Sequence, residues 1–226
     1  MTLTEYPDLV QGSEEWLEAR RGLVTASVVG KLITAKTVKP ASNDDSRGLA
    51  VLLASERITG WTEPTFMTGD MMRGVEDEPR ARDMYAEHFA PGPVRESGFM
   101  VRDDWGFRIG YSPDGLVGDN GLIECKSRRA KGQVVTILAN DVPPWNKAQL
   151  QCGLLVSGRE WIDYVSFASG MPLFVKRELP DPRWFEAILA AVSQLEDAVA
   201  DMVRDYGEAT KGLPVAERID DLEMSL

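Results

Sequence analysis

Three residues in the stretch SPDGLVGDNGLIECKS, which covers 112–127, carry groups that could act together in catalysis. In a β-strand, side chains two residues apart point to the same face, so Glu124 and Lys126 would share one face of the run LIECKS. Asp114 follows a proline at the end of the preceding β-like run. If these two runs lie side by side, Asp114, Glu124 and Lys126 meet at one end of a sheet, where two carboxylates could hold a hard cation such as Mg²⁺.

Two acids beside an ammonium group suit the attack of water on a phosphodiester. Metal ions neutralise the developing charge and make a bound water more acidic, and an ammonium group orients or activates the nucleophile. A simpler interpretation is also open, in which Glu124 and Lys126 form a cross-strand ion pair and Asp114 belongs to a Pro-Asp-Gly turn. The spacing alone does not choose between these two interpretations.

The composition restricts the other kinds of chemistry. The chain has 226 residues, and its one histidine, His88, excludes a site built from several histidines. Its two cysteines, Cys125 and Cys152, lie among apolar neighbours without zinc-like spacing, so we expect reduced thiols in the core. A net charge of −11 opposes non-specific coating of nucleic acid, but basic clusters such as KSRRAK leave room for a basic groove.

Helical patterns dominate the first 90 residues. Helices are predicted for the stretches 13–20, 25–33, 47–60 and 69–89. Thr25 or Ser27 would cap the second of these helices, and Pro79 should interrupt or kink the fourth unless it lies in a first turn. The residues at 34–47 are predicted to form a polar loop.

From residue 94 onward, β-like runs alternate with helices. Five runs are predicted to form one sheet: VRESGFMV, FRIGYS, GLIECKS, WIDYVSFAS and PLFVKREL. A helix is expected in PPWNKAQLQCGLLVS, and a long amphipathic helix should begin at Asp181 and Pro182. We therefore expect a single domain over residues 1–226 that mixes helices with a sheet, with residues 208–226 as a C-terminal arm.

Four motifs follow one another between Trp16 and Gln151. They are W-x-x-x-R with the TAS turn at 16–27, G-x-x-x-E-x-x-A-R at 74–82, SPDGL with LIECKS at 112–127, and AQLQ at 148–151. The third is similar to the signature of the PD-(D/E)XK nucleases. The set as a whole resembles the phage lambda exonuclease family, also called YqaJ-like viral recombinases.

This resemblance implies an α/β (α+β) fold with a restriction-endonuclease-like core, in which helices flank a central mixed β-sheet. It implies Mg²⁺-dependent 5′-to-3′ digestion of linear double-stranded DNA by a ring-shaped homotrimer, which leaves 3′ single strands for recombination by strand annealing. Two Mg²⁺ ions are expected, and Mn²⁺ should be able to replace them. A single-strand annealing protein is the expected partner.

The resemblance also assigns roles to residues that match the family's motifs. The metal ligands would be Asp114, Glu124, Glu78 and the backbone carbonyl of Cys125. Lys126 and Gln149 would hold the attacking water. Asp104 stands where the family has an acid, so it is either a metal-adjacent group or a solvated turn residue. His88 is expected to be a structural residue on an amphipathic helix.

A second site is implied for the end of the DNA. Arg20, Thr25 and Ser27 would bind the 5′-phosphate, since a guanidinium holds a phosphate through two hydrogen bonds and a helix N-terminus completes an anion pocket. In the alternative, Ser27 only caps a helix and Arg20 pairs with a surface acid. Met71 and Met72 are expected to pack in the core rather than to separate the terminal base pair.

Two other functions remain possible on the sequence. One is a restriction-type or RecB-like endonuclease with the same metal site, and the other is a catalytically inactive module that only binds DNA or a recombination partner. No stretch of about 18 uncharged apolar residues is present, so we expect a soluble, cytoplasmic protein without a membrane span.

Overall fold

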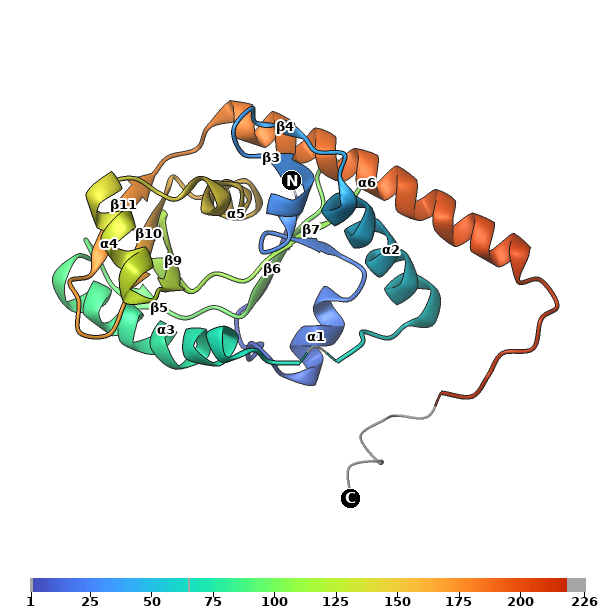
Figure 1. Ribbon diagram of the computed structural model, residues 1–226, viewed down its shortest axis with the longest axis horizontal. Coiled ribbons are helices and arrows are strands. Elements are labelled where there is room, and N and C mark those ends of the chain that lie inside the picture. The colour runs from blue at the N-terminus through green and yellow to red at the C-terminus, as the bar shows by residue number, and fades with distance from the viewer. Residues whose placement is uncertain (1, 65, 219–226) are drawn as a thin grey trace, which may run out of the picture.

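The computed structural model describes residues 2–64 and 66–218, and its central element is a mixed β-sheet (Figure 1). The five strands of this sheet lie in the order β11-β10-β9-β8-β5. Their bounds are Val94–Arg95 for β5, Gly115–Val117 for β8, Gly121–Ser127 for β9, Trp161–Phe167 for β10 and Phe174–Glu178 for β11. Strands β9 and β10 run parallel and the other neighbours antiparallel, so the predicted mixed sheet is confirmed.

A second sheet lies beside the first, so the prediction of one sheet was wrong. Its strands, in the order β1-β6-β7-β2, are Leu3–Tyr6 (β1), Phe99–Arg102 (β6), Ile109–Tyr111 (β7) and Val24–Thr25 (β2). The run VRESGFMV therefore divides between the two sheets. The cause lies at Gly98, where a side chain would collide with the backbone oxygens of Tyr6 and Leu9, so the N-terminal segment crosses there and pairs with β6.

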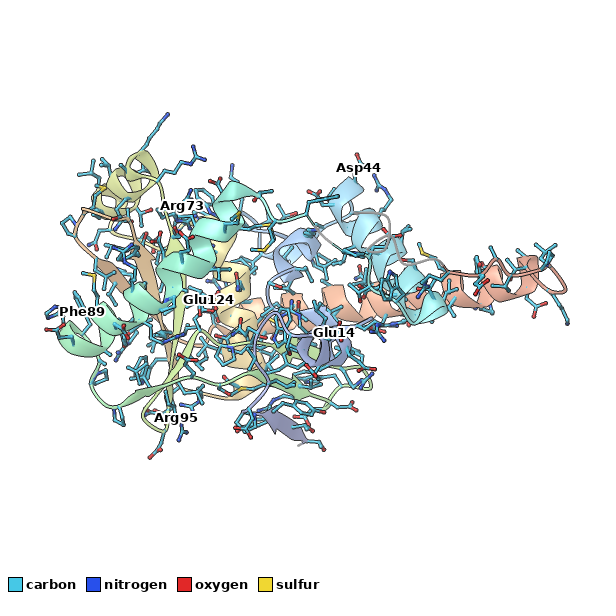
Figure 2. The ribbon with its side chains drawn as sticks, turned by 90° about the horizontal axis from the view of Figure 1, so that it is seen from below. Glu14, Asp44, Arg73, Phe89, Arg95 and Glu124 are labelled. Carbon is cyan, nitrogen blue, oxygen red and sulfur yellow. The ribbon has the colours of Figure 1, made fainter. Side chains whose placement is uncertain are left out.

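Strand β9 presents its alternate side chains to two different helices. Ile123 and Cys125 pack with Ala81 and Tyr85 of α3 (Gly69–His88), which lies across β9 and β10 (Figure 2). Leu122 belongs to the larger core on the other face, to which α5 (Pro144–Ser157) contributes. The alternation places Glu124 and Lys126 on the face toward α5.

The remaining helices build the rest of the core. They are α1 (Glu14–Arg20), α2 (Asp44–Thr59), α4 (Ala130–Ala139) and α6 (Pro182–Ala209). Helix α6 packs on α2 and α5, and its C-terminal end extends beyond the sheets (Figure 1). It begins as predicted, because the side chain of Asp181 accepts a hydrogen bond from the backbone N–H of Arg183.

The stretch 25–47 is less helical at its start and more ordered afterwards than predicted. Instead of a helix over 25–33 there is a short 3₁₀-helix, Val29–Leu32, without a side-chain cap. Strands β3 (Ile33–Thr34) and β4 (Lys39–Pro40) then form a small hairpin that starts at the last residue of the predicted helix and extends into the predicted loop. Helix α2 starts three residues early because Asn43 and Ser46 form a capping box.

Helix α4 was not predicted, because polar residues lie on its buried face and apolar residues on its exposed face. Gln133 and Thr136 are buried, whereas Val134, Val135 and Leu138 are exposed. The buried amide of Gln133 donates hydrogen bonds to the carbonyl of Ser166 in β10 and to that of Pro172 in the loop between β10 and β11. A polar face therefore holds this helix to the sheet, so the usual apolar periodicity gives no signal here.

Helix α3 continues through Pro79, so the predicted interruption does not occur, and the alternative of a kink stays a prediction. Proline leaves the carbonyl four residues earlier, that of Val75, without its helical partner. Both Pro79 and Val75 are exposed, so water can satisfy that carbonyl. Met71 and Met72 near the start of the same helix are exposed as well, so the expectation that they pack in the core was wrong.

Both cysteines are free and buried, as predicted, and burial raises the pKa of Cys152 to about 12. The proposed arm at 208–226 starts in the last turn of α6, and residues 219–226 lie outside the described residues. Within the part of the chain that the structure describes, no helix has the length and apolar character needed to cross a membrane.

Candidate active site

The hairpin of β8 and β9 brings Asp114 beside Glu124. Gly115 pairs with Ile123 in this antiparallel hairpin, so the residue before Gly115 lies opposite the residue after Ile123. Oδ2 of Asp114 accepts a hydrogen bond of 2.7 Å from the backbone N–H of Cys125. The two acidic side chains are therefore neighbours at one end of the sheet.

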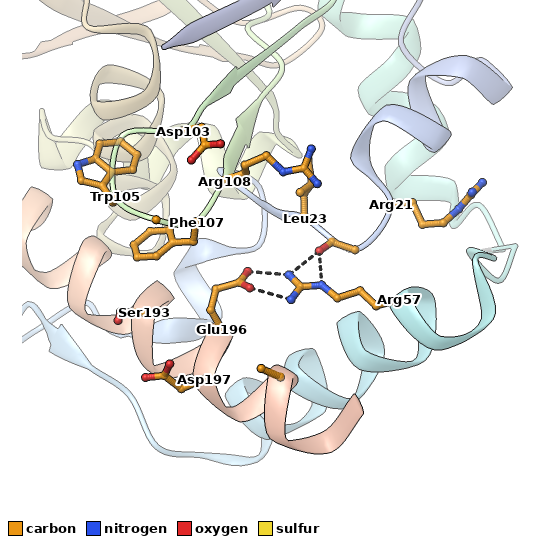
Figure 3. Close-up of a pocket in the computed structure, with 13 residues that line it drawn as sticks. Arg21, Leu23, Arg57, Asp103, Trp105, Phe107, Arg108, Ser193, Glu196 and Asp197 are labelled. Atoms are coloured by element: carbon orange, nitrogen blue, oxygen red, sulfur yellow. Dashed lines mark hydrogen bonds and ion pairs between the residues drawn. The ribbon is translucent and has the colours of Figure 1, made fainter. Parts of the chain in front are cut away.

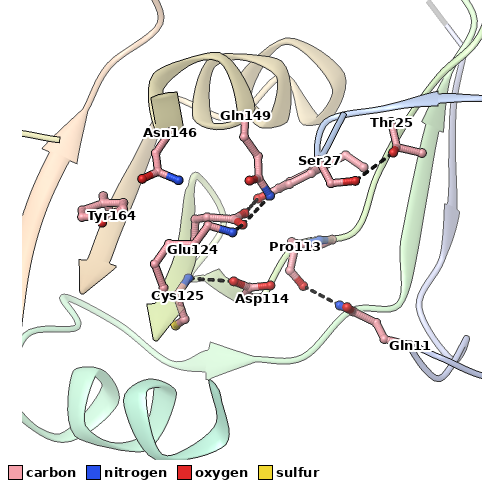
Figure 4. A network of polar contacts seen from close by, with 12 residues as sticks. Gln11, Thr25, Ser27, Pro113, Asp114, Glu124, Cys125, Asn146, Gln149 and Tyr164 are labelled. Atoms are coloured by element: carbon pink, nitrogen blue, oxygen red, sulfur yellow. Dashed lines mark hydrogen bonds and ion pairs between the residues drawn. The ribbon is translucent and has the colours of Figure 1, made fainter. Parts of the chain in front are cut away.

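The carboxylate of Glu124 accepts hydrogen bonds from side chains of three elements, and Figure 4 shows Gln149 of α5 pointing toward it. Only 1% of Glu124 is exposed. Its Oε1 accepts hydrogen bonds from Nζ of Lys126 at 2.7 Å and from Nε2 of Gln149 at 2.5 Å. Its Oε2 accepts a weaker one from the Tyr111 hydroxyl at 3.4 Å. Strand β9, helix α5 and strand β7 thus meet at a single acid.

The surroundings favour the neutral forms of Asp114 and Glu78 and the charged form of Lys126. Burial, followed by the charge of Glu124, raises the pKa of Asp114 well above its ordinary value. Burial also raises the pKa of Glu78, an effect that Arg82 opposes and Glu124 increases. Burial alone would lower the pKa of Lys126, but the carboxylates of Glu124 and Asp114 outweigh it and raise that pKa. Negative charge at this site therefore exceeds what Lys126 can balance.

Glu78 approaches the other acids from α3. One turn later, Arg82 donates a hydrogen bond of 3.2 Å to the Glu78 carboxylate and another of 2.8 Å to the backbone carbonyl of Asp114. Arg82 thereby ties α3 to the loop that carries Asp114. The side chain of Glu78 remains 30% exposed, so it lies at the margin of the buried cluster.

No three His, Cys, Asp or Glu side chains among residues 2–64 and 66–218 are gathered closely enough to hold a metal ion as they stand. In this arrangement Lys126 and Gln149 donate hydrogen bonds to Glu124, and Asp114 accepts one from the N–H of Cys125. The backbone carbonyl of Cys125 as a further ligand stays a prediction.

A cavity of about 200 Å³ connects the acids with the second group of residues singled out by the sequence. Seven of the predicted site residues line it: Asp114, Glu124, Lys126, Gln149, Arg20, Thr25 and Ser27. The lining does not include Glu78 or Cys125. Residues more than 100 positions apart in the chain, such as Arg20 and Lys126, therefore share one cavity.

Arg20 is held in this cavity by neutral partners. Its guanidinium donates hydrogen bonds of 3.4 Å to the hydroxyl of Thr25 and 3.3 Å to that of Ser27, and it stacks 3.8 Å from the ring centroid of Trp16. Within the described part of the chain, Arg20 forms no ion pair. This differs from the alternative interpretation of the sequence, in which Arg20 pairs with a surface acid. Burial lowers its pKa to about 10, which leaves it charged at neutral pH.

The structure also places three residues whose roles the sequence left open or assigned outside the cluster of acids. Ser27 does not cap a helix, because the following 3₁₀-helix has no side-chain cap. Asp104 lies in the turn between β6 and β7, at the end of the hairpin opposite Asp114, and its carboxylate accepts hydrogen bonds from the N–H of Thr2 and from Arg102. It fixes the N-terminal strand and is not beside the acids. His88 is exposed and lies 3.7 Å from Glu87.

Sequence reasoning missed several residues that complete the cavity. Ser112 accepts hydrogen bonds from the Trp16 indole at 3.0 Å and from Arg20 at 3.3 Å. Tyr111 lines the cavity beneath Glu124, and Gln11 donates to the carbonyl of Pro113 at 3.4 Å. Tyr111 and Ser112 directly precede the Pro-Asp pair, and that adjacency was the available signal.

Comparison with known proteins identifies the family of the chain. The chain matches the model of the YqaJ-like viral recombinase domain over residues 15–160. It is similar to the crystal structure of an alkaline exonuclease from Laribacter hongkongensis, with 31% sequence identity and a TM-score of 0.77 over 89% of this chain and 100% of that chain. The same exonuclease has also been crystallised in complex with dAMP.

A more distant structure shares the fold. A phage-related exonuclease from Haemophilus somnus has 15% identity and a TM-score of 0.59 over 81% of this chain and 96% of that chain. A search among curated proteins finds no match to the sequence. The family match and the exonuclease likeness leave no support for an inactive DNA-binding module. The chain belongs to the YqaJ-like viral recombinase family, the family of phage lambda exonuclease, and is a nuclease.

Proposed function

We propose that this nuclease is a Mg²⁺-dependent exonuclease of the PD-(D/E)XK type that digests linear double-stranded DNA 5′ to 3′ from 5′-phosphorylated ends. The observation that carries the proposal is the shared cavity, in which Arg20 lies with Asp114, Glu124 and Lys126. An exonuclease must hold a DNA end within reach of the groups that cut it. A cationic group and a carboxylate pair in one cavity meet this requirement.

The acids have the chemistry of a site for a hard divalent cation. Asp114 and Glu78 have raised pKa values because they are buried near Glu124, and a cation placed among them would relieve that cost. Two Mg²⁺ ions would be held by Asp114, Glu124, Glu78 and the Cys125 carbonyl, and Mn²⁺ could replace them. Bound there, the metal would stabilise charge on the phosphate oxygens and make a nearby water more acidic.

Lys126 and Gln149 would position the attacking water. Both donate to the same oxygen of Glu124, so their donor groups converge on one point in the cavity. Because its pKa is raised, Lys126 carries a proton at neutral pH and acts as a donor and a positive charge. Gln149 can donate through its nitrogen and accept through its oxygen, which fixes a water molecule in one orientation.

Arg20, Thr25 and Ser27 would bind the terminal 5′-phosphate. The guanidinium supplies charge and paired donors, and the two hydroxyls beside it complete the set of donors. The Laribacter relative binds dAMP, a deoxynucleoside monophosphate of the kind that stepwise removal of nucleotides releases. Each cut creates a new 5′-phosphate for Arg20, so the enzyme would advance along one strand and leave the other single-stranded.

This activity suits the first step of phage-type recombination by strand annealing. The exposed 3′ strand would bind to a single-strand annealing protein. Digestion and annealing would both take place in the cytoplasm, where the DNA lies. A homotrimeric ring would keep the duplex in a channel. Light scattering of the purified protein tests the ring directly, since a mass of three chains is expected and a monomer would contradict it.

The central test uses a linear duplex that carries separate labels at its two 5′ ends and two 3′ ends. With Mg²⁺ we expect early release of the 5′ labels as mononucleotides and late release of the 3′ labels. Ca²⁺, which coordinates oxygen with less strict geometry, should support binding with little cleavage. Early release of the 3′ labels would contradict the proposed polarity.

A restriction-type or RecB-like endonuclease is the alternative, and covalently closed circular DNA separates it from the exonuclease. An enzyme that needs a DNA end leaves the closed circle intact and degrades the same plasmid after it has been linearised. An endonuclease converts the closed circle to a linear or nicked form.

A further inference from the structure

The turn that joins Arg20 to Thr25 is held on both sides of one peptide. Gly22 lies in this turn with φ of +67°, a conformation that favours glycine, and a Cβ there would come within 2.9 Å of Cγ of Arg57. Its N–H donates a hydrogen bond of 2.7 Å to Oε2 of Glu56. Its carbonyl accepts hydrogen bonds from Nε and Nη2 of Arg57 at 2.9 and 2.7 Å. Two neighbouring residues of α2 thus fix both polar groups of Gly22.

The same arginine connects this turn to the C-terminal helix (Figure 3). Arg57 forms a two-point ion pair with Glu196 of α6, with both N–O distances at 2.7 Å. The side chains are 29% and 20% exposed, so the pair is partly shielded from water. One guanidinium therefore holds Gly22 and Glu196 at once, a geometry that lysine cannot reproduce.

These contacts have a specific geometric consequence for the phosphate site. Arg20 lies two residues before Gly22 and Thr25 lies three residues after it, so a rotation of the Gly22 peptide changes the separation of the guanidinium and the hydroxyl. Neither Arg57 nor Glu196 lines the cavity in which Arg20 lies with the acids, nor a second cavity that Arg20 and Glu56 both line. The charge of Glu56 also acts directly on Arg20, where it opposes the lowering of the pKa by burial. Any effect of Arg57 or Glu196 on the phosphate must therefore pass through the turn.

We propose that Glu56, Arg57 and Glu196 form a clamp of positioning residues, which holds the Gly22 turn so that Arg20 and Thr25 can bind a 5′-phosphate together. This inference rests on the proposed function of Arg20. It makes the recognition of a phosphorylated end depend on a contact between α2 and α6 that lies outside the cavity of the acids.

The test measures initial rates of nucleotide release from two duplexes that differ only in a 5′-phosphate or a 5′-hydroxyl. In Glu196→Gln and Arg57→Lys we expect the rate on the phosphorylated duplex to fall on the order of tenfold, because small misplacement of a positioning group carries such effects. The rate on the 5′-hydroxyl duplex should stay within about twofold of the unmodified protein. The preference for phosphate therefore falls as well.

Arg204→Gln provides a matched control on the same helix. Arg204 pairs at the surface with Asp201 and Asp205 and does not contact the turn, so both rates should remain unchanged. Thermal unfolding of each variant shows whether it is folded. If Arg57→Lys does not accumulate as a folded protein, Glu196→Gln decides the question, because it keeps the shape of the side chain.

Two results would overturn the clamp. One is an equal loss of rate on both duplexes, which would indicate a general structural role, and the other is an unchanged preference in Glu196→Gln. If the unmodified protein itself shows no preference for a 5′-phosphate, the proposed phosphate site fails and the clamp fails with it. That result is distinct from a preference that is present in the unmodified protein and retained by the variants.

Discussion

Glu124 accepts hydrogen bonds from Lys126 and Gln149 on the same oxygen, and this convergence gives the candidate site its chemistry. The lysine keeps its charge because two carboxylates lie beside it, although burial acts in the opposite direction. A fixed ammonium group in a buried site stabilises negative charge without reorganisation during the reaction. Lys126 should therefore contribute to the rate of cleavage more than to the stability of the fold.

Replacement of Lys126 by methionine tests this role. We expect nucleotide release with saturating Mg²⁺ to fall by roughly 100-fold or more, as is typical when a positioned charged donor is removed from an active site. Lys211→Met, at an exposed position beyond α6, serves as the control and should retain full activity. Activity of Lys126→Met within about threefold of the unmodified protein would exclude the assigned role.

Asp114 should reduce the stability of the metal-free protein. In the folded state the pKa of Asp114 is raised well above its ordinary value of 3.8, so folding favours the neutral carboxyl. That favourable contribution is complete below pH 3.8 and is lost as the pH rises through the raised value of the folded state. At pH 8 in EDTA, Asp114→Asn should therefore raise Tm by about 2 °C or more.

The same variant should respond differently to pH and to metal. The stabilisation should shrink as the pH falls toward 4, because the aspartate then becomes neutral as well. Mg²⁺ should raise Tm of the unmodified protein but not that of Asp114→Asn, since a ligand that binds only the folded state stabilises it. A lower Tm for Asp114→Asn at pH 8 in EDTA would contradict the charge argument.

At the scale of secondary structure elements, the position of Glu78 depends on how α3 is attached to β9. The hydroxyl of Ser127 donates a hydrogen bond of 2.7 Å to the buried carboxylate of Asp77 and accepts one of 3.0 Å from Arg73. Asp77 directly precedes Glu78 on the helix, and Ser127 directly follows Lys126 on the strand. The hydrogen bond thus fixes the helix against the strand beside both site residues.

Ser127→Ala should loosen this attachment and weaken metal binding. The hydrogen bond to Asp77, which is the one beside Glu78, corresponds to about 0.5–1.5 kcal/mol, so we expect the Mg²⁺ concentration for half-maximal activity to rise roughly three- to tenfold. Ser55→Ala on α2 removes a hydroxyl that bonds only within its own helix and provides the control. A titration curve of Ser127→Ala that superimposes on that of the unmodified protein would show that Asp77 and Ser127 do not position Glu78.

The sequence predicted those parts of the site that depend on short-range geometry. The alternation of β9 places Glu124 and Lys126 on one face, and a hairpin of three-residue connection brings Asp114 to them. The separation of two sheets depends on the N-terminal segment crossing at Gly98, a contact between distant residues that no local pattern records. Helix α4 was not predicted for a different reason, since its buried face is polar and therefore lacks the apolar periodicity of a typical helix.

At the scale of the whole molecule, the cavity joins two parts of the chain that do not share a local motif. Arg20 comes from α1 and Asp114 from the hairpin of the central sheet, and Ser112 contacts Arg20 from the segment that leads to Asp114. An overall charge of −11 would repel DNA from most of the surface, so attraction must be concentrated where arginine and lysine meet the cavity. Such a distribution favours access by a DNA end over binding along a duplex.

The most direct measurement of the central claim compares nucleotide release by the unmodified protein and by Arg20→Ala on 5′-phosphorylated and 5′-hydroxyl linear duplexes with Mg²⁺. We predict a clear preference of the unmodified protein for the phosphorylated end. In Arg20→Ala that preference should disappear through slower release from the phosphorylated duplex, while the Mg²⁺-induced rise in Tm persists. Equal rates of the unmodified protein on both ends, or an undiminished preference in Arg20→Ala, would contradict the account of one cavity that both holds and cuts a DNA end.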